Sequence, residues 1–78
     1  MPGMTPYRNR SGRSGVSAYA IGKGFIRVRF GHDGTYEYTD TTPGRAHVHN
    51  MQRLATAGVG LSTYISRFVR DRYVRKLD

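Results

Sequence analysis

Two short segments in the middle of the chain alternate apolar and polar residues in steps of two. Residues 25–30 (Phe-Ile-Arg-Val-Arg-Phe) and residues 35–39 (Thr-Tyr-Glu-Tyr-Thr) flank a turn that contains Asp33-Gly34. Alternation on both sides of an Asp-Gly turn is typical of an antiparallel β-hairpin with one buried face. The predicted inner face carries Ile26, Val28, Phe30, Tyr36 and Tyr38. The predicted outer face carries Phe25, Arg27, Arg29, Thr35 and Glu37.

A third strand is predicted directly before this hairpin. Residues 16–21 (Val-Ser-Ala-Tyr-Ala-Ile) have β character, and they end at Gly22-Lys23-Gly24, which is a turn signal. Three consecutive strands joined by tight turns form an antiparallel meander.

The second half of the chain has helical spacing. Thr41 or Thr42 is a suitable N-cap, Pro43 suits the first helical position, and Gly58 suits the C′ position after Ala57. The apolar stripe of this helix is Val48, Met51, Leu54 and Ala55. A second helix is predicted after Gly60, with Leu61, Tyr64, Ile65, Phe68 and Val69 on one face. The sequence therefore predicts an α+β fold of order β-β-β-α-α, a three-stranded antiparallel meander with two helices packed on one face.

The N-terminal 15 residues contain Pro, Gly, Ser, Asn and Arg with almost nothing to bury. We predict a flexible, basic Gly/Arg-rich arm over residues 1–15 and a single small domain over residues 16–78. Arg8, Arg10 and Arg13 in the arm could lie along a phosphate backbone. The alternative is a disordered tail that binds nothing.

Composition narrows the class of partner. Thirteen Lys and Arg against five Asp and Glu give a net charge of +8, and only Lys23 and Lys76 are lysines. Such an excess favours nucleic acid, then an acidic protein surface, then anionic lipid, over a merely charged surface. The chain has no Cys, which favours a reducing, cytoplasmic setting. No segment has the apolar length of a signal peptide or a membrane span, so we expect a soluble protein with no membrane partner.

Several motifs occur together in one order. They are the strand 26–30, Gly31 and Gly34, Tyr36-Glu37-Tyr38, Pro43, residues 54–58 and 60–65, and Tyr73. In this order and spacing the chain resembles the KTSC domain, a short bacterial module found alone and at the C-terminus of some lysyl-tRNA synthetases. Thr42-Pro43 stands where that family commonly has Val-Pro. The resemblance implies a shared small fold, and it implies RNA binding, the only function suggested for the family.

The outer sheet face offers the most specific candidate site. Arg27 and Arg29, flanked by Lys23 and Phe25, could supply phosphate contacts beside a stacking platform. Tyr19, Tyr7 and Phe25 are the stacking candidates, while Arg67 and Arg70 add cations on the second helix. The alternatives are a solvated strand face whose charges prevent edge pairing, and cations that offset a helix dipole. Glu37 is interpreted as an ion-pair partner of the outward arginines.

No pattern of catalytic residues is present. His47 and His49, at i and i+2 on a helix, point apart, and no Cys or acidic cluster completes a metal site. Gly22-x-Gly24 lacks the rest of a phosphate loop. We therefore expect no enzyme activity and no cofactor.

The sequence leaves three interpretations open. The first is a small nucleic-acid-binding module, with RNA or single strands favoured over duplex DNA because no helix-turn-helix pattern stands out. The second is a protein–protein interaction module, such as a phage or mobile-element protein that occupies an acidic or nucleic-acid-binding surface of a host protein. The third is a homodimer that forms through the open sheet edge.

Overall fold

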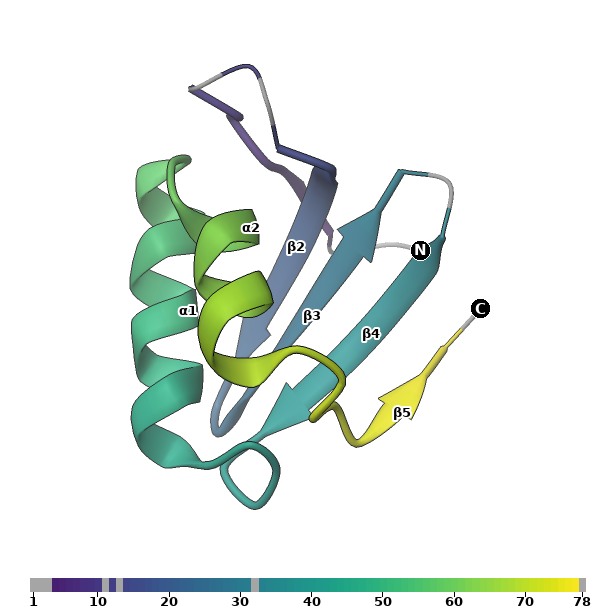
Figure 1. Cartoon of the computed structure of the whole chain (residues 1–78), viewed down its shortest axis with the longest axis vertical. Helices are drawn as coiled ribbons and strands as arrows, with labels where there is room; N and C mark the ends of the chain where they lie inside the picture. The colour runs from purple at the N-terminus through teal and green to yellow at the C-terminus, as the bar shows by residue number, and fades with distance from the viewer. Residues whose placement is uncertain (1–3, 11, 13, 32, 78) are drawn as a thin grey trace.

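Five antiparallel strands in sequence order form one sheet, and two helices cover one of its faces (Figure 1). The computed structural model describes residues 4–10, 12, 14–31 and 33–77. The strands are β1 (Thr5–Pro6), β2 (Val16–Gly22), β3 (Phe25–Phe30), β4 (Gly34–Thr39) and β5 (Arg75–Lys76). The helices are α1 (Arg45–Ala57) and α2 (Leu61–Tyr64), and α2 continues as a π-helical segment, η1 (Ile65–Val69). The α+β class is confirmed, whereas the expected number of strands, three, is wrong.

The central meander β2-β3-β4 has the predicted faces. Ile26 pairs with Tyr38, and Val28 pairs with Tyr36. Residues directly opposite each other in a sheet point to the same side. Because Ile26 and Val28 are fully buried under the helices, the other residues of β3 and β4 lie on the inner and outer faces that the alternation predicts.

The two edge strands were not predicted. β1 pairs with β2 at Thr5 and Tyr19, and β5 pairs with β4 at Arg75 and Glu37. Each has only two residues, which is too short for any periodicity to show. The β4 edge, at which a second copy could have paired, is therefore already covered by a short, charged strand that disfavours further pairing.

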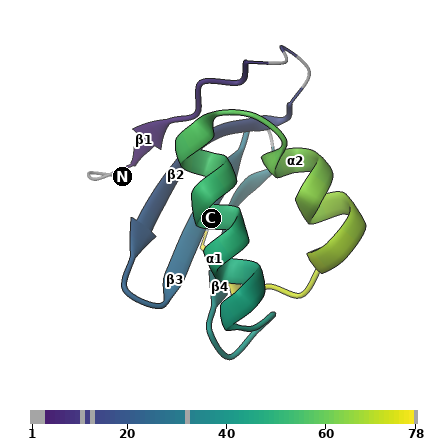
Figure 2. The same ribbon diagram turned by 90° about the vertical axis from the view of Figure 1, so that its left-hand side faces the viewer.

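Residues 5–10 pack against the domain, whereas we expected a flexible arm over residues 1–15. Figure 2 shows β1 beside β2 at the sheet edge. Tyr7 is only 6% exposed and belongs to the core. Its N–H donates to the carbonyl of Ser17 at 3.0 Å, and its hydroxyl accepts the N–H of Leu61 at 3.3 Å. A single aromatic side chain thus anchors residues 5–10, and the polar composition of the segment gave no sign of this contact.

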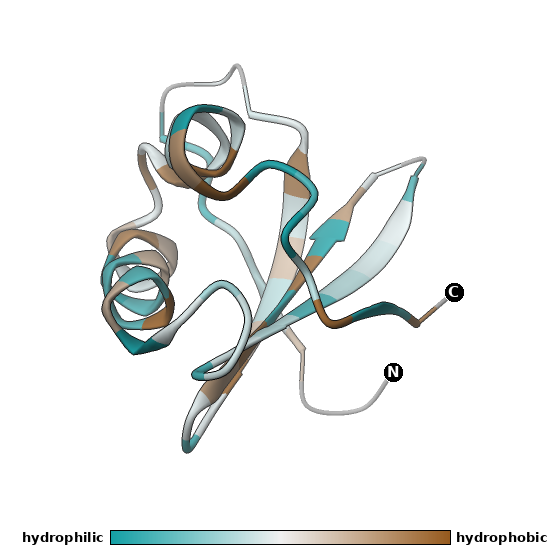
Figure 3. Ribbon diagram, turned by 60° about the horizontal axis from the view of Figure 1, so that its bottom comes forward, coloured by the Kyte–Doolittle hydropathy of each residue, from teal (hydrophilic) through white to brown (hydrophobic). Residues whose placement is uncertain are grey.

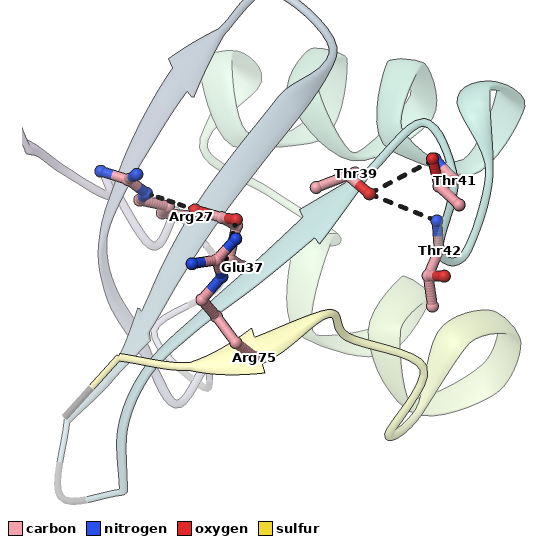
Figure 4. Close-up of polar contacts among 6 residues, drawn as sticks. All are labelled: Arg27, Glu37, Thr39, Thr41, Thr42 and Arg75. Carbon is pink, nitrogen blue, oxygen red and sulfur yellow. Dashed lines mark hydrogen bonds and ion pairs between the residues drawn. The ribbon is translucent and has the colours of Figure 1, made fainter.

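The start of α1 also differs from the prediction. The helix begins at Arg45 after Gly44, with no side-chain cap, so Pro43 is not its first residue and neither Thr41 nor Thr42 is its N-cap. Instead, the hydroxyl of Thr39 accepts the N–H groups of Thr41 and Thr42 at 3.3 Å and shapes the loop after β4 (Figure 4).

The end of α1 is as predicted. Gly58 has a φ of 77°, and its N–H bonds to the carbonyls of Leu54 and Ala55. Apolar and polar positions alternate around both helices, as amphipathic packing requires (Figure 3). The buried side chains of α1, α2 and η1 pack against Ile26, Val28 and Tyr38 in one core. These side chains are Val48, Met51, Ala55, Leu61, Ile65 and Val69.

Candidate nucleic-acid interface

A charge ladder crosses the outer face of the sheet. Glu37 on β4 accepts Nε–H of Arg27 on β3 at 2.9 Å through one carboxylate oxygen, and it pairs with Nε of Arg75 on β5 at 3.2 Å through the other (Figure 4). The Glu37 side chain is only 8% exposed, so its charge needs these partners. Arg27 is therefore held by its own fold, where the sequence suggested a guanidinium displayed to a ligand. The predicted ion pair of Glu37 is confirmed for Arg27, whereas the second partner is Arg75 and not the other outward arginine, Arg29.

Phe25 on the same face is also engaged within the chain. The guanidinium carbon of Arg27 lies 5.1 Å from the centre of the Phe25 ring. The ring lies across its cross-strand neighbour Gly22, where an added β-carbon would come within 2.1 Å of Phe25 Cε2. A base that stacks on Phe25 must therefore compete with Arg27 for the ring.

The other two stacking candidates are not displayed on the outer face. Tyr7 is buried in the core. Tyr19 pairs with Val28, so its side chain belongs to the helix-covered side and packs partly buried against the core. Arg29, which lies opposite Thr35, is exposed on the outer face. Within the part of the chain that the structure describes, Arg29 makes no ion pair.

A basic groove runs between α1 and the β2–β3 turn. Arg45, His49 and Arg53 follow one another at four-residue intervals on one exposed side of α1. A hollow of about 580 Å³ is lined by Lys23, Gly24, Asp40, Arg45, Ala46, Val48, His49 and Gln52. A second hollow of about 510 Å³ is lined by Ile21, His49, Gln52, Arg53, Thr56 and Ala57. Both hollows border on His49 and Gln52, so they are neighbours along α1, and together they are here called the α1 groove.

Gln52 fixes the position of the helix against the turn. Its side-chain amide donates to the carbonyls of Gly22 at 3.1 Å and Phe25 at 2.9 Å. These bonds connect α1 to both ends of the β2–β3 turn, and Lys23 in this turn lines the same hollow as Arg45. Asp40 is the acidic residue among those that line it.

Two further cations lie at the far end of α1. Arg8 packs its aliphatic stem on Gly58, and the N–H of Arg10 donates to the carbonyl of Gly58 at 2.8 Å. The side chains of Arg8 and Arg10 are exposed. Together with the groove they form a basic strip along α1, defined as Lys23, Arg45, Arg53, Arg8 and Arg10. Arg13, the third predicted cation of the arm, lies outside the described residues.

The remaining predicted cations lie near the π-helical segment. Arg67 is exposed on η1, and Arg70 follows it with a positive φ of 47°. Arg70 lines a third pocket together with Phe30, Tyr36, Tyr38 and Tyr73. The Tyr36 hydroxyl donates to Asp33 at 2.8 Å, which raises the pKa of Tyr36, and burial raises the pKa of Tyr38. Both phenols are therefore neutral near pH 7.

The histidines of α1 have separate surroundings. His47 Nδ1 lies 2.7 Å from the Tyr64 hydroxyl, which also accepts from Asn50 at 3.2 Å, so this cluster joins α1 to α2. His49 is exposed in the α1 groove. Among the residues with described positions, no three His, Asp or Glu side chains come together as a metal site. Over the same residues, no helix has the length and apolar character to cross a membrane.

Most of the positive charge is not neutralised within the fold. Ion pairs involve Arg27, Arg75 and Lys76 among the twelve described Arg and Lys residues, which leaves nine without an acidic partner in the described chain. Sequence reasoning missed Arg45 and Arg53, although their spacing with His49 was a visible signal of one helix face.

A scan against models of protein families finds no match, and searches of curated proteins and of solved structures find no significantly similar relative. The resemblance to the KTSC domain therefore stays a hypothesis that rests on the motifs alone.

Proposed function

We propose that this chain is a small, non-catalytic nucleic-acid-binding module for RNA or single strands. The observation that carries the proposal is the set of nine described cations without an acidic partner, five of which form the strip along α1. Unpaired, exposed guanidinium groups bind phosphates and release counterions from the nucleic acid, which supplies most of the affinity of such proteins.

The shape of the strip favours a single strand. One side of α1 packs on the sheet, and the β2–β3 turn lies beside its basic side. The helix therefore does not protrude, as a helix must in order to enter a major groove. A flexible backbone can follow the groove instead. Arg45 and Arg53 are eight positions apart, which is about 12 Å along the helix, and several phosphates can be contacted over this length.

The outer sheet face is a secondary contact surface in this proposal. Arg29 is exposed there, but the charge of Arg27 is largely offset by Glu37. The sheet face thus contributes less net attraction than the five cations along α1.

Fluorescence anisotropy with a labelled single-stranded RNA at low salt tests the proposal. The double variant Arg45→Gln/Arg53→Gln should weaken binding about tenfold, because each substitution removes one phosphate contact. The double variant Arg67→Gln/Arg72→Gln removes the same charge from an exposed surface outside the strip, and it should weaken binding only about two- to threefold.

Two results would overturn the proposal. Equal loss in both variants would mean that only net charge matters and that α1 is not the interface. No binding by the wild type would exclude the function and favour the protein-interaction module, whose complex with an acidic protein should have a defined stoichiometry and survive moderate salt.

A further inference from the structure

Four aromatic rings surround a pocket on the helix-covered face of the sheet, which is opposite the face that carries the ladder. The pocket has a volume of about 300 Å³ and is lined by Phe30, Tyr36, Tyr38, Tyr73, Ile65, Arg70, Asp33 and Asp71. The Tyr36 ring centre lies 4.6 Å from that of Tyr73 and 5.8 Å from that of Phe30. The Tyr38 ring centre lies 6.4 Å from that of Tyr73. Such a concave, largely aromatic surface with a few polar groups is typical of a site for a planar ligand.

Arg70 is held at this pocket in a strained backbone conformation. Its φ of 47° and ψ of −116° are values that glycine adopts easily and other residues avoid. The π-helical bond from its N–H to the carbonyl of Ile65 and the turn bond from Arg72 N–H to the carbonyl of Val69 impose this geometry. A strained non-glycine residue beside a pocket is a mark of function, because the strain costs stability and the side chain must compensate for it.

The charges around the pocket select the kind of ligand. Asp33 accepts the Tyr36 hydroxyl and lies 3.9 Å from Lys76 Nζ, so it is already engaged. Asp71 forms no ion pair within the described chain. The carboxylates of Asp33 and Asp71 at the rim repel a free phosphate, but that of Asp71 can accept the N–H donors on the edge of a nucleobase. The rings can stack on the base, and a guanidinium such as that of Arg70 can stack on it or pair with its phosphate.

We infer that this pocket takes one base of the bound strand, with Arg70 at its mouth. The inference rests on the proposed nucleic-acid binding and adds a base-dependent contact to it. Stacking of one base contributes a measurable share of affinity, which a purely electrostatic surface does not supply.

The test compares two single-stranded oligomers of equal length and charge, one with bases and one made of abasic units. The inference predicts that the wild type binds the oligomer with bases at least fivefold more tightly, and that 2-aminopurine within it changes fluorescence on binding. Equal affinity for the two oligomers would overturn the base pocket while leaving the proposed function intact. Absence of binding to either would overturn both.

Two variants separate the pocket from mere charge. Arg70→Gly removes the backbone strain of the positive φ, so the melting temperature should rise by about 5 °C. The same variant should bind the oligomers with and without bases equally tightly. Arg72→Gly removes the same charge at an exposed neighbour whose φ is not positive, so its melting temperature should not rise and the base preference should persist. A base preference that survives in Arg70→Gly would contradict the inference.

Discussion

Arg8 rests directly on Gly58, the residue that ends α1. A β-carbon built at position 58 would lie 2.6 Å from Arg8 Cβ and 3.2 Å from its Cγ. Real side chains do not approach so closely, so the absence of a side chain at Gly58 is what lets the N-terminal segment cross the end of the helix. The contact also brings the cations of this segment to α1, and thereby links the fold to the proposed interface.

The substitution Gly58→Ala should therefore lower the free energy of unfolding by more than an alanine in a left-handed conformation ordinarily does. Gly58 has a φ of 77°, and Gly60, which serves as the control, has a φ of 84°. A β-carbon at Gly60 meets nothing nearer than Leu54 Cδ2 at 3.6 Å. We expect Gly60→Ala to lower the free energy of unfolding by about 1 kcal/mol and Gly58→Ala by about 2–3 kcal/mol, measured by urea unfolding. Equal losses would mean that the N-terminal segment does not pack on α1.

Two substitutions that each remove one negative charge distinguish the surfaces of the molecule. Asp40 lines the α1 groove, whereas Glu37 lies on the outer sheet face between Arg27 and Arg75. In RNA titrations at low salt, Asp40→Asn should raise affinity about three- to fivefold, and Glu37→Gln should change it less than twofold. The opposite order would place the interface on the outer sheet face.

The same pair should differ in stability. The Glu37 carboxylate is 8% exposed and binds two guanidinium groups, so Glu37→Gln should lower the free energy of unfolding by about 1–2 kcal/mol. Asp40 is exposed and forms no ion pair in the described chain, so Asp40→Asn should stay within about 0.5 kcal/mol of the wild type. Urea unfolding measures both, and a Glu37→Gln protein as stable as the wild type would show that the ladder contributes nothing.

Tyr38 should make the fold sensitive to alkaline pH. Burial raises the pKa of Tyr38 above its ordinary value of 10. The unfolded chain then loses its phenolic proton more readily than the folded chain, so the stability that Tyr38 contributes is complete below pH 10 and is lost as the pH rises through the folded pKa.

Urea midpoints between about pH 9 and 12 should therefore fall with increasing pH, and the fall should be smaller in Tyr38→Phe. A slope unchanged in Tyr38→Phe would mean that another group causes the alkaline unfolding.

The sequence predicts those parts of the fold that repeat. The alternation from Phe25 to Thr39 extends over two strands, so both faces of β3 and β4 could be assigned. β1 and β5 have two residues each and depend on contacts far along the chain, such as that of Tyr7 with Leu61. Neither a pattern nor a propensity records such contacts.

The candidate site was predicted only in part. The charge excess pointed to an anionic partner, and the outward direction of Arg27 and Arg29 follows from the alternation. The relative placement of cations depends on tertiary packing, which brings Arg8 to the end of α1 and Lys23 to its flank. The π-helical turn before Arg70 was also hidden, because Leu61, Ile65 and Val69 fit an ordinary α-helical stripe equally well.

The salt dependence of RNA binding tests the central claim most directly. If Lys23, Arg45, Arg53, Arg8 and Arg10 each contact a phosphate of a single strand, the logarithm of the association constant should fall against the logarithm of salt concentration with a slope of about −3.5. A slope near zero, or no binding even at low salt, would contradict the account, because the unpaired cations along α1 would then have no polyanionic partner.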